Sequence, residues 1–273
     1  YDNIKQEFKD NMQFITHISV PVAWRRQYCG IFEARAGGVI YYLLDNQYYF
    51  KRDGLYGHYD DAERFAFFSR AVLEIIPHIG FVPDIIHCND WQTAMVPVYL
   101  SEFYRHDPLY ENIKTVFTIH NIQYQGKYGK ELYNDVLGLP EGRESIVEYD
   151  DCVNLMKGAI QCSDKITTVS PTYAREILDP YYSHGLDNIL KQFTFKLTGI
   201  VNGIDYVDFN PETDPNIRYK FNRDSNTNNS ITKRNINHDT VRLSIPSSYS
   251  STKLMKLTQT KTFGILYNHN RSI

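Results

Sequence analysis

Polar residues that can donate and accept hydrogen bonds and protons follow four short apolar segments of this 273-residue chain. The segments end in His87-Cys88-Asn89-Asp90-Trp91, His120-Asn121, Ser170-Pro171 and Asn202-Gly203-Ile204-Asp205. If the segments are parallel strands, their carboxyl ends lie at one edge of the sheet, where open α/β sheets bind ligands. The joint placement of the four clusters therefore predicts one site, and it is more informative than any single residue.

The elements that would position these residues alternate from residue 83 onward. Apolar and β-branched patterns predict strands over 84–88, 114–119, 165–169 and 197–201, and helical spacing predicts helices over 91–105, 131–137, 153–161 and 187–193. Ser170 as cap with Pro171 at the first position opens a further helix. Strand and helix in alternation predict a Rossmann-like α/β fold, a parallel sheet with helices on both faces.

The first 59 residues form a β-hairpin-rich part. We expect a strand over 14–20 and a hairpin of 30–35 with 39–44 around Ala36-Gly37-Gly38. Tyrosines crowd this part, either as strand-forming residues packed on a sheet or as stacking platforms for sugars or bases. Asp60-Asp61-Ala62-Glu63 fits a capping box that starts a helix, for which Gly80 is a reasonable stop.

Each residue of the predicted site also has a purely structural interpretation. Asp90 could cap the helix that follows, His120 could link a loop to the core, and Trp91 could be core or crevice wall. Ser170 is most simply a helix cap, and Asn202-Gly203 is a common turn.

Several other chemistries lack their motifs in this sequence. It contains no GxGxxG, GxxxxGK[ST], HExxH or GxSxG, and no His or Cys spacing typical of zinc, so we expect no cofactor and no metal. Glu148, Asp150 and Asp151 raise the possibility of a glycosidase pair, but an acidic helix start is favoured. Four cysteines without a CxxC pair indicate reduced thiols, and neither a secretory signal nor a membrane span is found, so we expect a cytoplasmic protein.

Charge is distributed unevenly although the net charge is only −3. Residues 216–273 carry ten Lys or Arg against two Asp and are rich in Asn, Ser and Thr. A basic tail can bind nucleic acid. Because this one lacks clustered Lys/Arg runs and a binding motif, we expect no nucleic-acid partner. We interpret 216–273 as a polar tail, disordered or aberrant, behind a domain over 1–215.

Longer motifs at the same strand ends resemble those of the bacterial glycogen synthase and plant starch synthase family. They are PDIIHCNDWQT at 83–93, TIHNIQYQG at 118–126, TVSPTYAREI at 168–177, GIVNGID at 199–205 and FNPETD at 209–214. YCGIFE at 28–33 and DDAERF at 60–65 fit the same register. The resemblance covers 14–215, and its motifs stand in the order of the family.

The resemblance implies transfer of glucose from ADP-glucose to the non-reducing end of an α-1,4-glucan, with retention and without a metal, by a two-domain GT-B fold. It implies that Asp90 and His120 are catalytic, with His120 on the transferred glucose. It further implies that substrate is bound by Tyr56, Trp91, Asn121 and Asn202. Fixed dipoles and hydrogen bonds suit a developing oxocarbenium ion and a leaving diphosphate.

Three departures from the family pattern shape the expectation for this chain. Nothing matches the family's Lys-Thr-Gly-Gly-Leu loop, the Arg…Lys pair and Glu-x-x-Gly-Leu motif of its second domain are absent after Asp214, and the resemblance ends near Asn216. We therefore expect an amino-terminal catalytic-domain fragment with little activity alone, and an open sheet edge that promotes association. The alternative is a non-catalytic glucan-binding module that uses the acceptor half-cleft.

Overall fold

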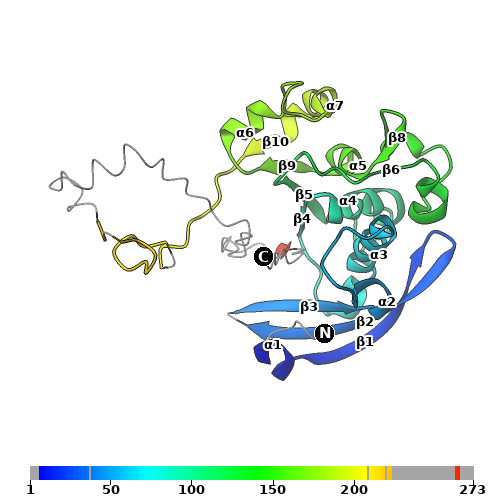
Figure 1. Cartoon of the computed structure of the whole chain (residues 1–273). Coiled ribbons are helices and arrows are strands. Elements are labelled where there is room, and N and C mark those ends of the chain that lie inside the picture. The colour runs from blue at the N-terminus through cyan, green and yellow to red at the C-terminus, as the bar shows by residue number, and fades with distance from the viewer. Residues whose placement is uncertain (1–5, 37, 208, 219, 223–261, 265–273) are drawn as a thin grey trace. The chain divides into compact units, whose positions relative to one another are not determined.

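The structure, a computed structural model, describes residues 6–36, 38–207, 209–218, 220–222 and 262–264. The chain divides into two compact units, one of residues 1–201 with 257–268 and one of residues 202–256 with 269–273. The first unit contains every helix and strand named below (Figure 1). None of the helices in the described ranges is both long and apolar enough to cross a membrane.

The described part of the second unit consists of turns. The side-chain oxygen of Asn210 accepts a hydrogen bond from the Glu212 amide at 2.9 Å, and Asp214 Oδ1 accepts one from the Asn216 amide at 2.8 Å. Such local side-chain bonds to the backbone two residues on are typical of Asn and Asp in turns.

The N-terminal sheet is antiparallel and follows the short helix α1 (Gln6–Asp10). Its strands, in spatial order, are β1 (Gln13–Val22), β2 (Arg25–Ala36) and β3 (Val39–Asp45). The predicted hairpin is confirmed by pairing of β2 with β3, and β2 also pairs with β1. Cys29 and Ile31 of β2 are fully buried whereas Arg26 and Tyr28 are exposed, so these two pairs of side chains lie on opposite faces of the sheet.

The second sheet is parallel, which confirms the α/β fold class. Its spatial order is β10-β9-β5-β4-β11, and the strands are β4 (Ile85–Asn89), β5 (Lys114–Ile119), β9 (Lys165–Thr168), β10 (Leu197–Gly199) and β11 (Thr262–Gly264). β11 pairs with β4 in parallel at Ile85, Ile86 and His87. The expectation of an open sheet edge is therefore wrong at β4, which has a neighbour on each side there.

Helical segments connect the parallel strands. They are η2 (Trp91–Thr93), α4 (Met95–Tyr99), η3 (Leu100–Tyr104), α5 (Leu155–Cys162), α6 (Pro171–Glu176), α7 (Asp187–Gln192) and η6 (Thr194–Lys196). The helix predicted over 91–105 is a succession of 3₁₀, α and π turns. Pro97 lies within it and has no N–H for the regular bond to the preceding turn.

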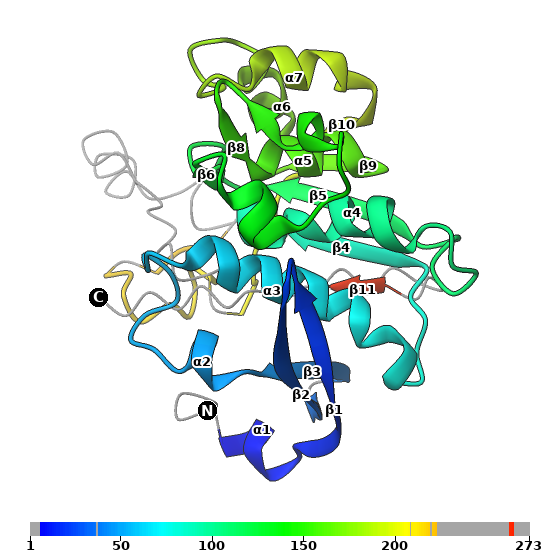
Figure 2. The ribbon, with the colours of Figure 1, turned by 90° about the vertical axis from the view of Figure 1, so that its right-hand side faces the viewer.

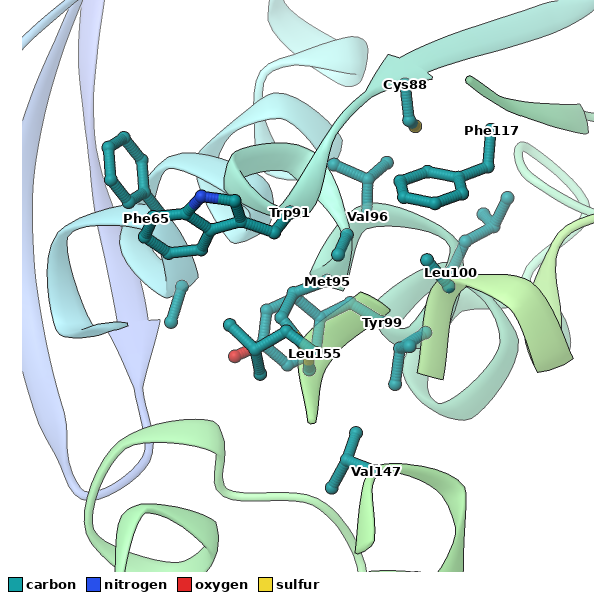
Figure 3. Close-up of a cluster of buried hydrophobic side chains, with 14 of the residues drawn as sticks. Phe65, Cys88, Trp91, Met95, Val96, Tyr99, Leu100, Phe117, Val147 and Leu155 are labelled. Atoms are coloured by element: carbon teal, nitrogen blue, oxygen red, sulfur yellow. The ribbon is translucent and has the colours of Figure 1, made fainter. Parts of the chain in front are cut away.

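The core of the first unit lies between the parallel sheet and these helices. Figure 3 shows Cys88 and Phe117 of the sheet beside Val96 and Leu100, and all four side chains are fully buried. Alternation along β4 and β5 places Cys88 and Phe117 on this face. His87, Asn89 and Thr118 therefore belong to the other face, which brings polar groups to the site.

A small three-stranded sheet follows β5. It consists of β6 (Lys127–Tyr128), β7 (Glu148–Tyr149) and β8 (Cys152–Asn154), and the loop between β6 and β7 holds η4 (Tyr133–Leu137) and η5 (Glu144–Ile146). Asp150 and Asp151 have φ of 53° and 60° and form the turn between β7 and β8. Glu148 and Asp151 both pair with Lys130, so the predicted acidic helix start is wrong.

The helix that carries the predicted capping box begins at the predicted place but without the predicted cap hydrogen bond. After α2 (Gln47–Phe50) come α3 (Asp61–Glu74) and η1 (Ile76–His78). The Asp60 carboxylate makes no cap hydrogen bond and instead pairs with Arg52 at 2.5 Å. The capping-box prediction is therefore wrong, because an arginine from the preceding loop takes the carboxylate that the helix end would have used.

A buried ion pair joins α3 to the preceding loop. Arg64 pairs with Asp61, and both side chains are almost completely buried. Arg64 Nε also donates to the Tyr49 carbonyl at 2.7 Å, and Asp61 Oδ2 accepts from the Gly57 amide at 2.6 Å. Removing one partner of such a pair leaves an uncompensated charge in the interior.

We predict that Arg64→Met destabilises the chain by about 3 kcal/mol in urea denaturation, because the buried Asp61 carboxylate loses its partner. Arg35→Met is the matched control, since Arg35 pairs with Glu33 on the surface, and its expected cost is below about 1 kcal/mol. Equal effects of the two substitutions would contradict a structural role for the buried pair.

Candidate functional site

The end of β4 has an unusual backbone at Asp90. Its φ of 55° and ψ of −178° lie in a region that residues with a side chain rarely adopt. The Asp90 amide donates to the Thr118 carbonyl of β5 at 3.0 Å, so the distorted residue remains joined to the sheet. Strained backbone of this kind is concentrated at functional sites, so this strand end is a candidate site.

The Asp90 carboxylate binds the backbone that follows β5. Its Oδ1 accepts hydrogen bonds from the His120 amide at 2.8 Å and the Asn121 amide at 3.5 Å. It makes no cap bond to the helical turn that begins at Trp91, so the interpretation of Asp90 as a helix cap is wrong. A carboxylate that accepts backbone N–H bonds fixes the loop that donates them.

His120 is also held through its ring. Its Nε2 lies 2.9 Å from Asn89 Oδ1, so the imidazole donates Nε2–H to the amide oxygen. Consecutive side chains of a regular strand point to opposite faces. The left-handed backbone at Asp90 ends this alternation, and as a result Asn89 and Asp90 both reach His120. His120 is thus fixed at two points, its main chain and its ring.

A second polar chain crosses the sheet beside His120. His87 Nε2 lies 2.6 Å from Thr118 Oγ1, which lies 2.5 Å from Thr167 Oγ1. Burial and the neighbouring His120 lower the pKa of His87, which favours a neutral imidazole. The sequence places His87 and Asn89 in the polar cluster at this strand end but assigns neither of them a catalytic or substrate-binding role. Their spacing of two residues on a strand that ends at Asp90 is the signal that could have identified them.

Trp91 forms one wall of a cavity of about 420 Å³ next to this strand end. The other lining residues come from the loop after β5, from β6 and from the loop before α7: Gln123, Tyr124, Gln125, Gly126, Lys127, Tyr128 and His184. The Trp91 ring is nearly buried and packs edge-on against Phe65 of α3 at 5.0 Å between centroids (Figure 3). Trp91 is therefore both core and cavity wall, as the sequence left open.

Buried amide groups hold the floor of this cavity. Gln125 Nε2 donates to the carbonyls of Ile122 and His184, and its Oε1 accepts from Asn154 Nδ2 at 2.7 Å. Asn154 Oδ1 in turn caps α5. The bonds to His184 and Asn154 fix the loop after β5 to the loop before α7 and to the start of α5.

Gly126 keeps the cavity wall close to the loop. Its φ is 66°, and a Cβ there would lie 2.9 Å from the Trp91 ring. A glycine is required on both counts, because the conformation is left-handed and the space is filled.

The remaining predicted site residues are less tightly placed. Asn121 is exposed, and its Oδ1 accepts from the Gln123 amide at 3.0 Å, which shapes the loop that lines the cavity. Tyr56 lies in the loop before α3, where Asp61 holds the Gly57 and His58 amides. Asn202 belongs to the second unit, which is described by itself. Ser170 is a helix cap, since its Oγ accepts from the Tyr173 amide at 2.9 Å.

No cluster of His, Cys, Asp or Glu suited to a metal occurs among the residues that the structure describes. The arrangement at the strand end consists of hydrogen-bonding groups in fixed orientations beside an aromatic wall. Such a site can bind a polar ligand with an apolar face and can stabilise charge that develops on it.

We predict that Asn89 protects the imidazole N–H of His120 from exchange with water. In ¹⁵N–¹H spectra of histidine-labelled protein, the wild-type chain and Asn89→Asp should show this proton, because both keep an acceptor oxygen, whereas Asn89→Ala should lose it.

His120→Gln assigns the signal in this experiment. Thr118→Val is the matched control, since it removes the hydroxyl group that meets His87 and leaves the Asn89 contact in place. Persistence of the His120 signal in Asn89→Ala would show that Asn89 does not orient the ring.

Comparisons with known proteins identify the family of the chain. A family model described as the starch synthase catalytic domain matches residues 1–192. Glycogen synthase of Geobacillus thermodenitrificans is 54% identical over 218 residues, which are 79% of this chain and 45% of that protein. Glycogen synthase of Bacillus cereus is 50% identical over 236 residues, 86% of this chain and 50% of that protein. The chain thus spans about half the length of these relatives.

A solved structure shares the fold. The catalytic domain of starch synthase IV from Arabidopsis thaliana, bound to ADP and acarbose, superimposes with a TM-score of 0.70 and 34% sequence identity. The match covers 81% of this chain and 47% of that one. The family match, the two bacterial relatives and this structure lead to one conclusion: the chain belongs to the glycogen and starch synthase family.

Proposed function

We propose that the site serves glucosyl transfer in glycogen or starch synthesis and forms the acceptor and sugar side of the reaction. The observation that carries the proposal is the double fixing of His120 by Asn89 and Asp90 beside the Trp91 cavity. Glycogen synthase relatives and a starch synthase neighbour bound to ADP and acarbose support it.

The reaction we propose is transfer of glucose from ADP-glucose to the non-reducing end of an α-1,4-glucan with retention. As the bond from the anomeric carbon to the diphosphate breaks, positive charge develops on the sugar and negative charge on the leaving group. An imidazole and a carboxylate-anchored loop held in advance stabilise such charge without reorganising. No metal is part of this proposal.

The residues take distinct roles in this reaction. His120 contacts the transferred glucose, and Asp90 sets the position of His120 through its main chain. Trp91 supplies the apolar wall of the acceptor site, to which we also assign Tyr56, Asn121 and Asn202. The family resemblance suggests these assignments, and the two anchors on His120 support the first of them.

For the chain alone we propose glucan binding with negligible turnover of ADP-glucose. The Trp91 cavity is built entirely from residues of the first unit, so glucan can bind there. The aligned segment makes up only about half of each relative, and donor binding by the other half would explain why transfer needs more than this chain. We further propose a catalytic-domain portion over 1–215, a tail over 216–273 whose residues 262–264 join the parallel sheet as β11, and a cytoplasmic location.

Electrophoresis through gels that contain glycogen tests the binding half of the proposal. We predict retardation of the wild-type chain and a clear reduction of it in Tyr124→Ala, because Tyr124 lines the cavity and is 55% exposed. Tyr181→Ala is the matched control, since Tyr181 is 83% exposed and does not line the cavity. Unretarded wild-type protein would refute acceptor binding by this chain.

Release of ADP from ADP-glucose in the presence of glycogen tests the catalytic half. We predict a rate close to background for the chain alone. Any measurable release should fall about 100-fold in His120→Ala and in Asp90→Asn without loss of folding, as expected when a positioned polar group is removed. Turnover at the wild-type rate in either variant would contradict the roles assigned to these residues.

A further inference from the structure

Trp24 occupies the tip of the β1–β2 hairpin and is 76% exposed, yet its orientation is fixed. Its indole N–H donates to Asp135 Oδ1 of η4 at 3.0 Å. The Arg25 guanidinium lies over the ring, 4.6 Å from its centroid. Figures 1 and 2 show the blue hairpin tip beside a green helical turn, in agreement with this contact.

The hairpin tip docks on η4 mainly through Arg25. Arg25 reaches the Asp135 carboxylate at 2.8 Å and the Asp135 carbonyl at 2.5 Å, and it also pairs with Glu63 of α3 at 3.4 Å. Backbone packing adds to this, because a Cβ on Gly138 would lie 2.7 Å from the Ala23 Cα. These contacts join the hairpin to the rest of the unit, and none of them requires a large aromatic ring at position 24.

The exposed indole is therefore a rigid apolar surface left in water. Exposed side chains normally keep their rotamer freedom, and immobilising them on binding costs conformational entropy that lowers the affinity. Trp24 has lost that freedom to Asp135 and Arg25 before any ligand arrives. A ring fixed in advance with a polar group at its edge is suited to binding a ligand that has an apolar face and hydroxyl groups.

The charges around the ring disfavour an anionic ligand. Arg25 lies between Glu63 and Asp135, so its charge is already compensated. The Trp24 N–H and the Arg25 guanidinium hold the pKa of Asp135 below its usual range, and its carboxylate stays available as an acceptor at neutral pH. A glucose unit matches these features, because it offers C–H groups to the ring and hydroxyl donors to the carboxylate.

We propose that Trp24 and Asp135 form a second glucan contact, separate from the Trp91 cavity. This inference rests on the proposed function, which makes an α-glucan the acceptor. A polymer carries many glucose units, so one chain can engage both places. The second contact then raises the local concentration of glucan ends at the first.

The two tryptophans of this chain allow the two contacts to be observed separately. Trp91→Phe leaves Trp24 as the sole indole emitter, and Trp24→Phe leaves Trp91. Each variant is titrated with maltoheptaose, with circular dichroism as a check of folding. We expect a saturable blue shift and reduced acrylamide quenching of Trp24, because a bound sugar displaces water from the exposed ring.

The outcomes distinguish this inference from the proposed function. If the fluorescence of Trp91 responds and that of Trp24 does not, the second contact is overturned and the acceptor site is still supported. A response of Trp24 alone supports the second contact and removes the support for the Trp91 cavity. If the fluorescence of neither tryptophan changes, both the second contact and glucan binding by this chain are overturned.

Glycogen-gel retardation provides a measurement that does not depend on folding of Trp91→Phe. Trp24→Ala should weaken retardation about threefold, within the range of a single aromatic contact. Phe195→Ala is the matched control, since Phe195 is 74% exposed and lies elsewhere, in η6. Equal retardation of Trp24→Ala and the control would overturn the proposal.

Discussion

The hydrogen bond from the His120 amide to the Asp90 carboxylate is the constraint on which the site depends. It joins the ends of two neighbouring strands through a side chain, at the point where ordinary sheet pairing stops. The left-handed backbone at Asp90 costs conformational energy, of order 1–3 kcal/mol for such a residue. In return, Asn89 and Asp90 both face His120, and the imidazole is oriented before any ligand binds. Preorganisation of this kind is what stabilisation of developing charge requires.

The N-terminal sheet and α3 support this arrangement from the side. Arg64 and Asp61 hold the loop before α3, and Phe65 one turn into the helix packs against Trp91. The cavity wall is therefore braced by a helix whose own start depends on a buried ion pair. Arg25 ties the β1–β2 hairpin to both α3 and η4, so the exposed Trp24 is anchored to the same framework. The ion pairs of Arg25 thus link the hairpin to α3, and the Phe65–Trp91 contact links α3 to the strand end.

Sequence patterns predicted the parallel strands well, because apolar, β-branched segments between turn residues are short-range signals; the strand over 114–119 has the observed bounds. They failed where a long-range partner decided the outcome. Asp60 fits a helix cap, but Arg52 binds its carboxylate. Asp150 and Asp151 look like an acidic helix start but form a hairpin turn.

The proximity of Asp90 and His120 was predictable from sheet topology. The role of Asn89 did not, since it depends on the positive φ of its neighbour. The assignments of Tyr56, Asn121 and Asn202 stay predictions.

The central claim is that the Trp91 cavity and the fixed His120 form the sugar side of a glucosyl-transfer site. A crystal structure of the chain with a bound maltooligosaccharide tests it most directly. The account predicts glucose units against Trp91 and Tyr124, with the non-reducing end directed at His120. Sugar bound elsewhere, with this cavity empty in the same crystal, would contradict it.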